Sequence, residues 1–184
     1  MAQVTLPSGV FLEYESLGNP SNPTMLWIMG FGAQMTAWPD EMLQMYVDAG
    51  FHVVRFDNRD CGLSYKHDGV MVDVGAVTAA ALMGDPPPPV PYTLSDMAAD
   101  AVGVLDGLGI AAAHIVGASM GGMIAQTLAI EFPARVLSLT SIMSVPGDMA
   151  YGTPTPEALN TLVAPPPEDR AAYIEGAKNW AVWC

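Results

Sequence analysis

Positively charged residues and cysteines are scarce in this sequence. It has 6 lysines and arginines against 19 aspartates and glutamates, so the formal net charge is −13. A chain this acidic repels phosphate backbones and anionic lipid surfaces, so we expect neither a nucleic acid nor a membrane as partner. The two cysteines, Cys61 and Cys184, lack the spacing of a metal site and are too few for a disulfide framework. We therefore expect structural thiols and no bound metal.

Long apolar runs are also missing. A membrane-spanning helix needs about 18–20 consecutive apolar residues, and no stretch of the sequence approaches that length. Residues 1–7 lack the basic region and apolar segment of a signal peptide, so we expect a cytoplasmic protein. Apolar residues make up 51% of the 184 residues and charged residues 14%, which is typical of one globular domain with a substantial core.

Apolar segments of strand length alternate along the chain with segments of helical periodicity. Continuous apolarity favours strands that are buried on both faces of a parallel sheet, and we expect such strands at residues 24–29 and 52–56. Further strands are expected at residues 114–117 and 136–143. An alternating pattern around Ser8-Gly9 predicts a hairpin of residues 2–7 and 10–17. Helices are expected at residues 40–49, 95–108 and 120–132, with Ser95 as the N-cap of the second. This order indicates a mostly parallel, doubly wound α/β sheet.

The character of the sequence changes after Pro146-Gly147. Residues 148–184 are rich in proline and contain two weakly helical pieces, at 157–163 and 168–182, but no strand-like segment. We interpret residues 1–147 as an α/β core with strands one to six, and residues 148–184 as the beginning of a cap or lid. No helix or strand is assigned to the long polar, glycine-containing stretch before Ser95, in which the proline run 86–89 excludes both.

A glycine-flanked serine stands between a predicted strand and a predicted helix. In the run Gly117-Ala118-Ser119-Met120-Gly121-Gly122, glycines two positions before and after Ser119 permit a turn too tight for neighbours that carry a Cβ. Such a turn raises the serine hydroxyl above the sheet edge, at a helix N-terminus whose N–H groups favour developing negative charge. We therefore predict that Ser119 is a catalytic nucleophile.

A serine nucleophile needs donors for the oxyanion that forms when it attacks a carbonyl group. One donor is expected to be the backbone N–H of Met120, the residue after the nucleophile. The loop after the first buried strand, Met29-Gly30-Phe31-Gly32, has an approachable backbone because of its two glycines. We assign the second donor to the N–H of Phe31.

A third polar element, residues 57–64, follows a buried strand. It reads Asp57-Asn58-Arg59-Asp60-Cys61-Gly62-Leu63-Ser64. Its charged side chains resemble catalytic machinery, but we interpret them as a structural loop in which carboxylates accept from turn amides and pair with Arg59.

Taken together, these motifs resemble the α/β-hydrolase superfamily, and in detail the aclacinomycin methylesterase-like esterases. The resemblance extends from about residue 3 to 147 and includes the Trp38-Pro39 pair. It implies an eight-stranded sheet, of which the last strands are lacking here, a helical cap after strand six, and a Ser–Asp–His triad. It also implies that Gly30, Gly32 and Trp38 contact the substrate and that no cofactor is needed. Serine at position 119 argues against the dehalogenase and epoxide hydrolase branches, which need a carboxylate nucleophile.

The histidine of such a triad should follow the serine, yet all three histidines precede it. His52 and His114 begin their strands, and about five residues at 3.3 Å each would separate His114 from Ser119. His67 lies in a loop without supporting spacing. Asp148, after strand six, is the candidate acid. We therefore expect a truncated hydrolase whose base lies outside these residues, a split enzyme completed by another chain, or a homo-oligomer that covers the open sheet edge.

The sequence leaves three functions open. The first is a serine hydrolase that cleaves a small apolar carboxylic ester through an acyl-enzyme at Ser119. The second is peptide or amide hydrolysis, or cofactor-free perhydrolysis, on the same scaffold. The third is a catalytically inert pseudo-hydrolase or fragment, because a serine without a base is a poor nucleophile at neutral pH.

Overall fold

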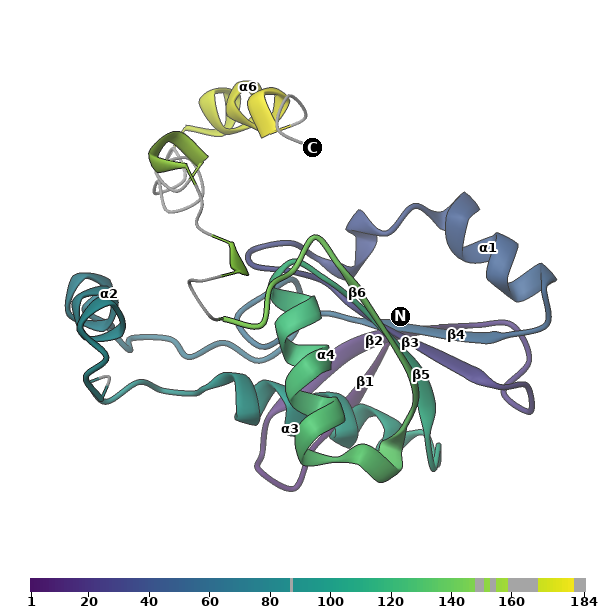
Figure 1. Cartoon of the computed structure of the whole chain (residues 1–184). Helices are drawn as coiled ribbons and strands as arrows, with labels where there is room; N and C mark the ends of the chain where they lie inside the picture. The colour runs from purple at the N-terminus through teal and green to yellow at the C-terminus, as the bar shows by residue number, and fades with distance from the viewer. Residues whose placement is uncertain (87, 148–150, 153–154, 159–168, 181–184) are drawn as a thin grey trace. The chain divides into compact units, whose positions relative to one another are not determined.

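The computed structural model describes residues 1–86, 88–147, 151–152, 155–158 and 169–180, and it divides into two compact units, Met1–Gly147 and Asp148–Cys184. The first unit contains a six-stranded sheet in the order β1-β2-β4-β3-β5-β6 (Figure 1). Its strands are β1 (Ala2–Thr5), β2 (Phe11–Leu17), β3 (Thr24–Ile28), β4 (His52–Phe56), β5 (Ala113–Ala118) and β6 (Val136–Ile142). The β1–β2 and β2–β4 pairs are antiparallel and the other three pairs are parallel.

The helices of the first unit fill the connections between the parallel strands. They are α1 (Asp40–Asp48), α2 (Val74–Met83), α3 (Leu94–Gly107) and α4 (Met120–Glu131), with short 3-10 helices at Met35–Ala37 and Pro133–Arg135. The second unit includes α6 (Arg170–Trp180). The expected strands and helices of residues 1–147 are therefore confirmed, and the sheet is mostly parallel as predicted. Of the two weakly helical pieces, the described residues contain 157–158 and 169–180.

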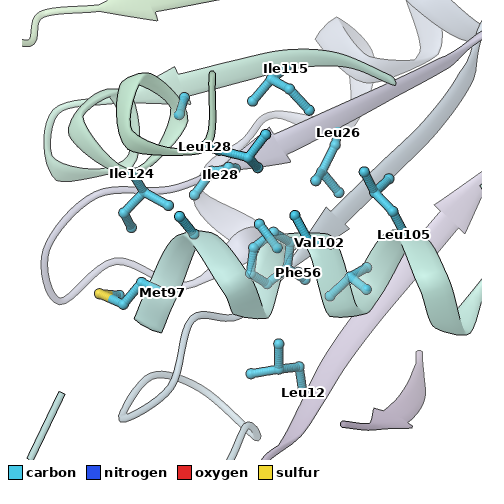
Figure 2. Packing of buried hydrophobic residues seen from close by; sticks show 14 of the residues in the cluster. Leu12, Leu26, Ile28, Phe56, Met97, Val102, Leu105, Ile115, Ile124 and Leu128 are labelled. Atoms are coloured by element: carbon cyan, nitrogen blue, oxygen red, sulfur yellow. The ribbon is translucent and has the colours of Figure 1, made fainter. Parts of the chain in front are cut away.

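Apolar side chains on the two faces of the sheet pack against different helices. On one face, α3 and α4 supply Met97, Val102, Leu105, Ile124 and Leu128 (Figure 2). These side chains meet sheet residues that are fully buried, including Leu26, Ile28, Phe56 and Ile115. On the other face, Leu43 of α1 packs with Trp27, Val53 and Val116. Figure 1 shows α3 and α4 on one side of the sheet and α1 on the other. This is the doubly wound arrangement that buries a parallel sheet on both faces.

Two local predictions are wrong. The N-cap of α3 is Thr93 and not Ser95: the Thr93 hydroxyl accepts from the N–H of Asp96, and the Asp96 carboxylate accepts from the N–H of Thr93. Ser95 instead donates to Glu131 at 2.6 Å. Helix α2 lies in the stretch to which no element was assigned, because its sequence is apolar on all sides and gives no helical periodicity.

Strand β6 is at the edge of the described sheet and bonds to β5 on one side. Leu137 and Leu139 of β6 are 57% and 41% exposed. In the part of the chain that the structure describes, no helix is long and apolar enough to cross a membrane.

Candidate active site

Three parallel strands, β4, β3 and β5, end side by side at one edge of the sheet. Ile28 of β3 pairs with Phe56 of β4 and with Gly117 of β5, so the segments that follow these residues emerge together. The carboxyl edge of a parallel sheet is where open α/β folds bind their ligands. The three elements singled out in the sequence, at Gly30, Asp57 and Ser119, therefore lie at one edge.

Ser119 occupies a strained turn between β5 and α4. Its φ of 55° and ψ of −123° fall outside the regions that residues with a Cβ prefer. A Cβ on Gly117 would lie 2.1 Å from the carbonyl oxygen of Gly121, and a Cβ on Gly121 would lie 2.2 Å from the carbonyl oxygen of Ile28. The backbone N–H of Ser119 donates to Ile142 at 2.9 Å. Both flanking glycines are therefore needed to bring strand, turn and helix this close.

The loop after β3 lies directly against this turn. A Cβ on Gly30 would be 2.9 Å from the Cβ of Ser119 and 3.4 Å from its hydroxyl oxygen. Residues 30–33 form a β-turn in which the N–H of Ala33 donates to Gly30, and Gly32 takes the left-handed position with φ of 67°. Phe31, at the second position of this turn, is 65% exposed.

Asp57 follows β4 and is only 3% exposed. Its carboxylate accepts from the N–H of Met35 at 2.7 Å and from the N–H of Leu63 at 3.2 Å. Asp60 accepts from the N–H of His67 at 2.7 Å. The carboxylates of this loop therefore bind backbone amides.

Arg59 does not pair with the carboxylates of its own loop, which corrects one detail of the sequence interpretation. It donates through two nitrogens, each at 2.7 Å, to Asp100 of α3, and both side chains are buried. Burial raises the pKa of the Asp100 carboxyl, against the hydrogen bonds and charge of Arg59, which lower it. This ion pair joins the loop after β4 to helix α3.

None of the three histidines has the contacts of a base for Ser119. His52 bonds to the hydroxyls of Ser16 and Thr24 at 2.7 and 3.0 Å, and His114 bonds to Ser138 at 2.8 Å. His52 and His114 lie at the amino-terminal ends of β4 and β5, at the sheet edge opposite Ser119.

His67 has a different environment. Its ring contacts Tyr65 and Tyr92, with centroids 5.1 Å apart in both cases, and its Nδ1 lies 3.6 Å from Asp60. The contacts of His67 are therefore with Tyr65, Tyr92 and Asp60, and none of them is with Ser119.

Two other predicted site residues are Trp38, for a substrate contact, and Asp148, for the catalytic acid. Trp38 is 7% exposed and packs edge-on against Trp27, with ring centroids 4.8 Å apart, so its place in the structure is in the core. Asp148, the candidate acid, lies outside the described residues. Within the described residues, no group of three or more His, Cys, Asp or Glu side chains has the arrangement of a metal site.

Three hydrogen bonds at the site were not predicted from the sequence. They join the loop after β4 to the loop after β3: Asn58 donates to the carbonyl of Met29 at 2.8 Å, Cys61 donates to the carbonyl of Ala33 at 3.0 Å, and Asp57 accepts from Met35. The signal in the sequence was that polar side chains follow one buried strand and glycines follow another. That signal does not say that the two strands are neighbours.

A doubly wound sheet with a strained serine at its carboxyl edge and a glycine loop beside it is the arrangement of an α/β hydrolase. The comparison with known families confirms this class. The chain belongs to the family described as the alpha/beta hydrolase fold, whose model matches residues 23–181.

Within this family, the chain is similar to several individual proteins. The chain is 35% identical over 150 residues to rhodomycin D methylesterase DnrP of Streptomyces peucetius, covering 82% of this chain and 44% of that protein. It is 33% identical to rhodomycin D methylesterase DauP of Streptomyces sp. (strain C5), with the same coverage. A solved carboxylesterase structure from Nitrososphaera gargenis is 25% identical, with a TM-score of 0.61, and the match covers 79% of this chain and 46% of that one. The chain thus spans less than half the length of these relatives.

Proposed function

We propose that this protein is a serine hydrolase that cleaves carboxylic esters through an acyl-enzyme at Ser119. The observation that carries the proposal is the strained backbone of Ser119, with Gly30 packed against its side chain. Strain of this kind persists only where the surrounding structure enforces it, and it clusters at catalytic sites. The esterase names of the relatives support an ester as the substrate.

The proposed reaction begins when the Ser119 Oγ attacks the ester carbonyl carbon and loses its proton to a base. The carbonyl oxygen becomes an oxyanion, which accepts hydrogen bonds from the N–H groups of Phe31 and Met120. The intermediate collapses, the alcohol leaves with the proton from the base, and Ser119 is acylated. A water molecule then repeats the sequence and releases the carboxylic acid. Loss of one oxyanion donor typically lowers kcat by about 10²–10³.

The base in this proposal is a histidine that does not belong to the 184 residues. In α/β hydrolases the triad follows the order serine, acid, histidine, and the three histidines of this sequence all precede Ser119. Asp148 remains a predicted acid. A site without its base retains the part of the rate enhancement that comes from the oxyanion hole and substrate binding, about 10³–10⁴ over water in serine proteases.

The proposed substrate is a small apolar ester. Methyl esters are the class that the names of the methylesterase relatives suggest. Gly30 lacks a Cβ and so allows the loop to pack directly against Ser119, while the Cβ position of Gly32 has nothing within 4 Å. Trp38 is buried against Trp27, so it is not proposed as a direct contact of the substrate.

The test is hydrolysis of p-nitrophenyl acetate by the whole chain, by Ser119→Ala and by Ser95→Ala. Ser95 is an exposed serine far from the site in sequence and is the matched control. The proposal expects Ser119→Ala to abolish the rate above background and Ser95→Ala to leave it unchanged. Equal rates for wild type and Ser119→Ala would refute the assignment.

A further inference from the structure

The loop after β3 that supplies the Phe31 donor, residues 29–35, is held by residues from a single neighbouring loop. Three side chains of the segment after β4 reach across to it. Asn58 donates to the Met29 carbonyl at 2.8 Å, Cys61 donates to the Ala33 carbonyl at 3.0 Å, and Asp57 accepts from the Met35 N–H at 2.7 Å. These bonds fix the beginning, the middle and the end of the donor loop.

The holding segment is itself rigid. Lys66 donates through its ammonium group to three backbone carbonyls, those of Cys61, Gly62 and Ser64, at 2.6–2.9 Å. Ser64 donates to the Asp57 carbonyl and accepts from the N–H of Glu13, which ties the segment to β2. A Cβ on Gly62 would lie 1.8 Å from the Asp57 carboxylate, so glycine is required there. A segment fixed in this way can impose a position on the loop beside it.

The donor loop needs such support because it has little of its own. Within it the N–H of Ala33 donates to Gly30 at 3.3 Å, a long hydrogen bond, and two of its residues are glycines. A peptide group between Gly30 and Phe31 can rotate unless its neighbours are held. Since the Met29 carbonyl belongs to the peptide group just before Gly30, a bond to that carbonyl limits the rotation.

We propose that Asn58 is a positioning residue for the oxyanion hole: by holding the Met29 carbonyl it aims the Phe31 N–H at the substrate oxygen, with Asp57 and Cys61 fixing the rest of the loop. This inference rests on the proposed function of Ser119 and Phe31. Asn58 is 5% exposed and bonds to a backbone carbonyl of the loop, so its role is to orient the donor and not to meet the substrate. Misplacement of a reacting group by about 1 Å costs on the order of 10²-fold in rate.

The experiment compares two substitutions of Asn58. Asn58→Asp keeps the shape but turns a carboxylate oxygen toward the Met29 carbonyl, which repels it. Asn58→Ala removes the bond without repulsion. The rate constant for labelling of Ser119 by a fluorophosphonate probe is measured for the full chain, together with kcat and KM for p-nitrophenyl acetate, below the melting temperature of each variant. We expect labelling and kcat to fall by roughly 10-fold to 100-fold in Asn58→Asp, and less in Asn58→Ala, with KM unchanged.

Two controls separate positioning from a loss of stability. Arg135→Ala removes bonds to the carbonyls of Ile110 and Ala111 at the opposite sheet edge, so it lowers stability without touching the donor loop. Cys61→Ser retains a donor for Ala33, whereas Cys61→Ala does not, so only the alanine should slow labelling. Wild-type labelling rates in both Asn58 variants would overturn the inference alone. No labelling of the wild-type chain would overturn the proposed function, and this inference with it.

Discussion

Gly30 and Ser119, which are 89 positions apart in the sequence, pack so closely that a Cβ on Gly30 would be 2.9 Å from the Ser119 Cβ. We therefore expect Gly30→Ala to push the donor loop away from the serine and to slow labelling of Ser119 by about 10-fold or more. Gly9→Ala is the control, because Gly9 has nothing within 4 Å of its Cβ position, although its φ of 84° makes a side chain there strained. That control should lose stability, by about 1 kcal/mol, and keep its labelling rate. Equal labelling of Gly30→Ala and wild type would contradict the close packing.

The ion pair between Arg59 and Asp100 predicts an asymmetric response to mutation. Asp100→Ala leaves a buried guanidinium without its partner, so the free energy of unfolding should fall by about 3–5 kcal/mol. Replacing both residues by apolar ones, as in Arg59→Met with Asp100→Leu, should cost less than the single change. Urea unfolding followed by circular dichroism measures both. A single variant less than 1 kcal/mol below wild type would show that the pair contributes little.

His52 predicts a loss of stability at mildly acidic pH. Its side chain is 2% exposed, and burial lowers its pKa below the ordinary value of 6.5. The unfolded chain therefore binds a proton at a higher pH than the folded chain does, so stability falls as the pH drops below about 6.5 and levels off below the folded pKa. His52→Gln keeps polar atoms between Ser16 and Thr24 and should flatten the slope between pH 6.5 and 5 in urea unfolding. An unchanged slope would assign the effect to other groups.

The exposed edge of β6 predicts self-association of the chain or capture of a complementing chain. Unpaired strand edges with apolar side chains recruit further strands. On β6, the side chains of Leu137 and Leu139 are exposed. Light scattering should give a mass above 19.4 kDa that rises with concentration. Leu139→Lys should lower that mass, because charged residues block edge pairing. A monodisperse monomer at all concentrations would contradict this prediction.

Much of the sheet could be predicted because its strands are local apolar runs, and the serine turn could be predicted because its glycines stand at fixed spacing. The hydrogen bonds around the turn could not. Asn58 and Met29 are 29 positions apart, and Cys61 and Ala33 are 28 apart, so their contact depends on β3 and β4 being neighbours. The partner of Arg59 was missed for the same reason, since Asp100 is 41 positions away.

Local signals were also missed. Asp73 accepts from the N–H of Ala76 at the start of α2, and alanines follow, which together favour a helix. The helix lacks a polar face, so periodicity did not reveal it. At α3, the pair Thr93 and Asp96 forms a capping box, in which aspartate stands where glutamate is the usual residue. Propensity and capping therefore decide elements that hydrophobic periodicity leaves open.

The measurement that tests the central claim most directly is the mass of the whole chain after incubation with a fluorophosphonate, followed by identification of the modified peptide. The account predicts one adduct per chain, located on Ser119 and absent in Ser119→Ala. An unmodified chain at high probe concentration, or an adduct on a different serine, would contradict the assignment of Ser119 as the nucleophile.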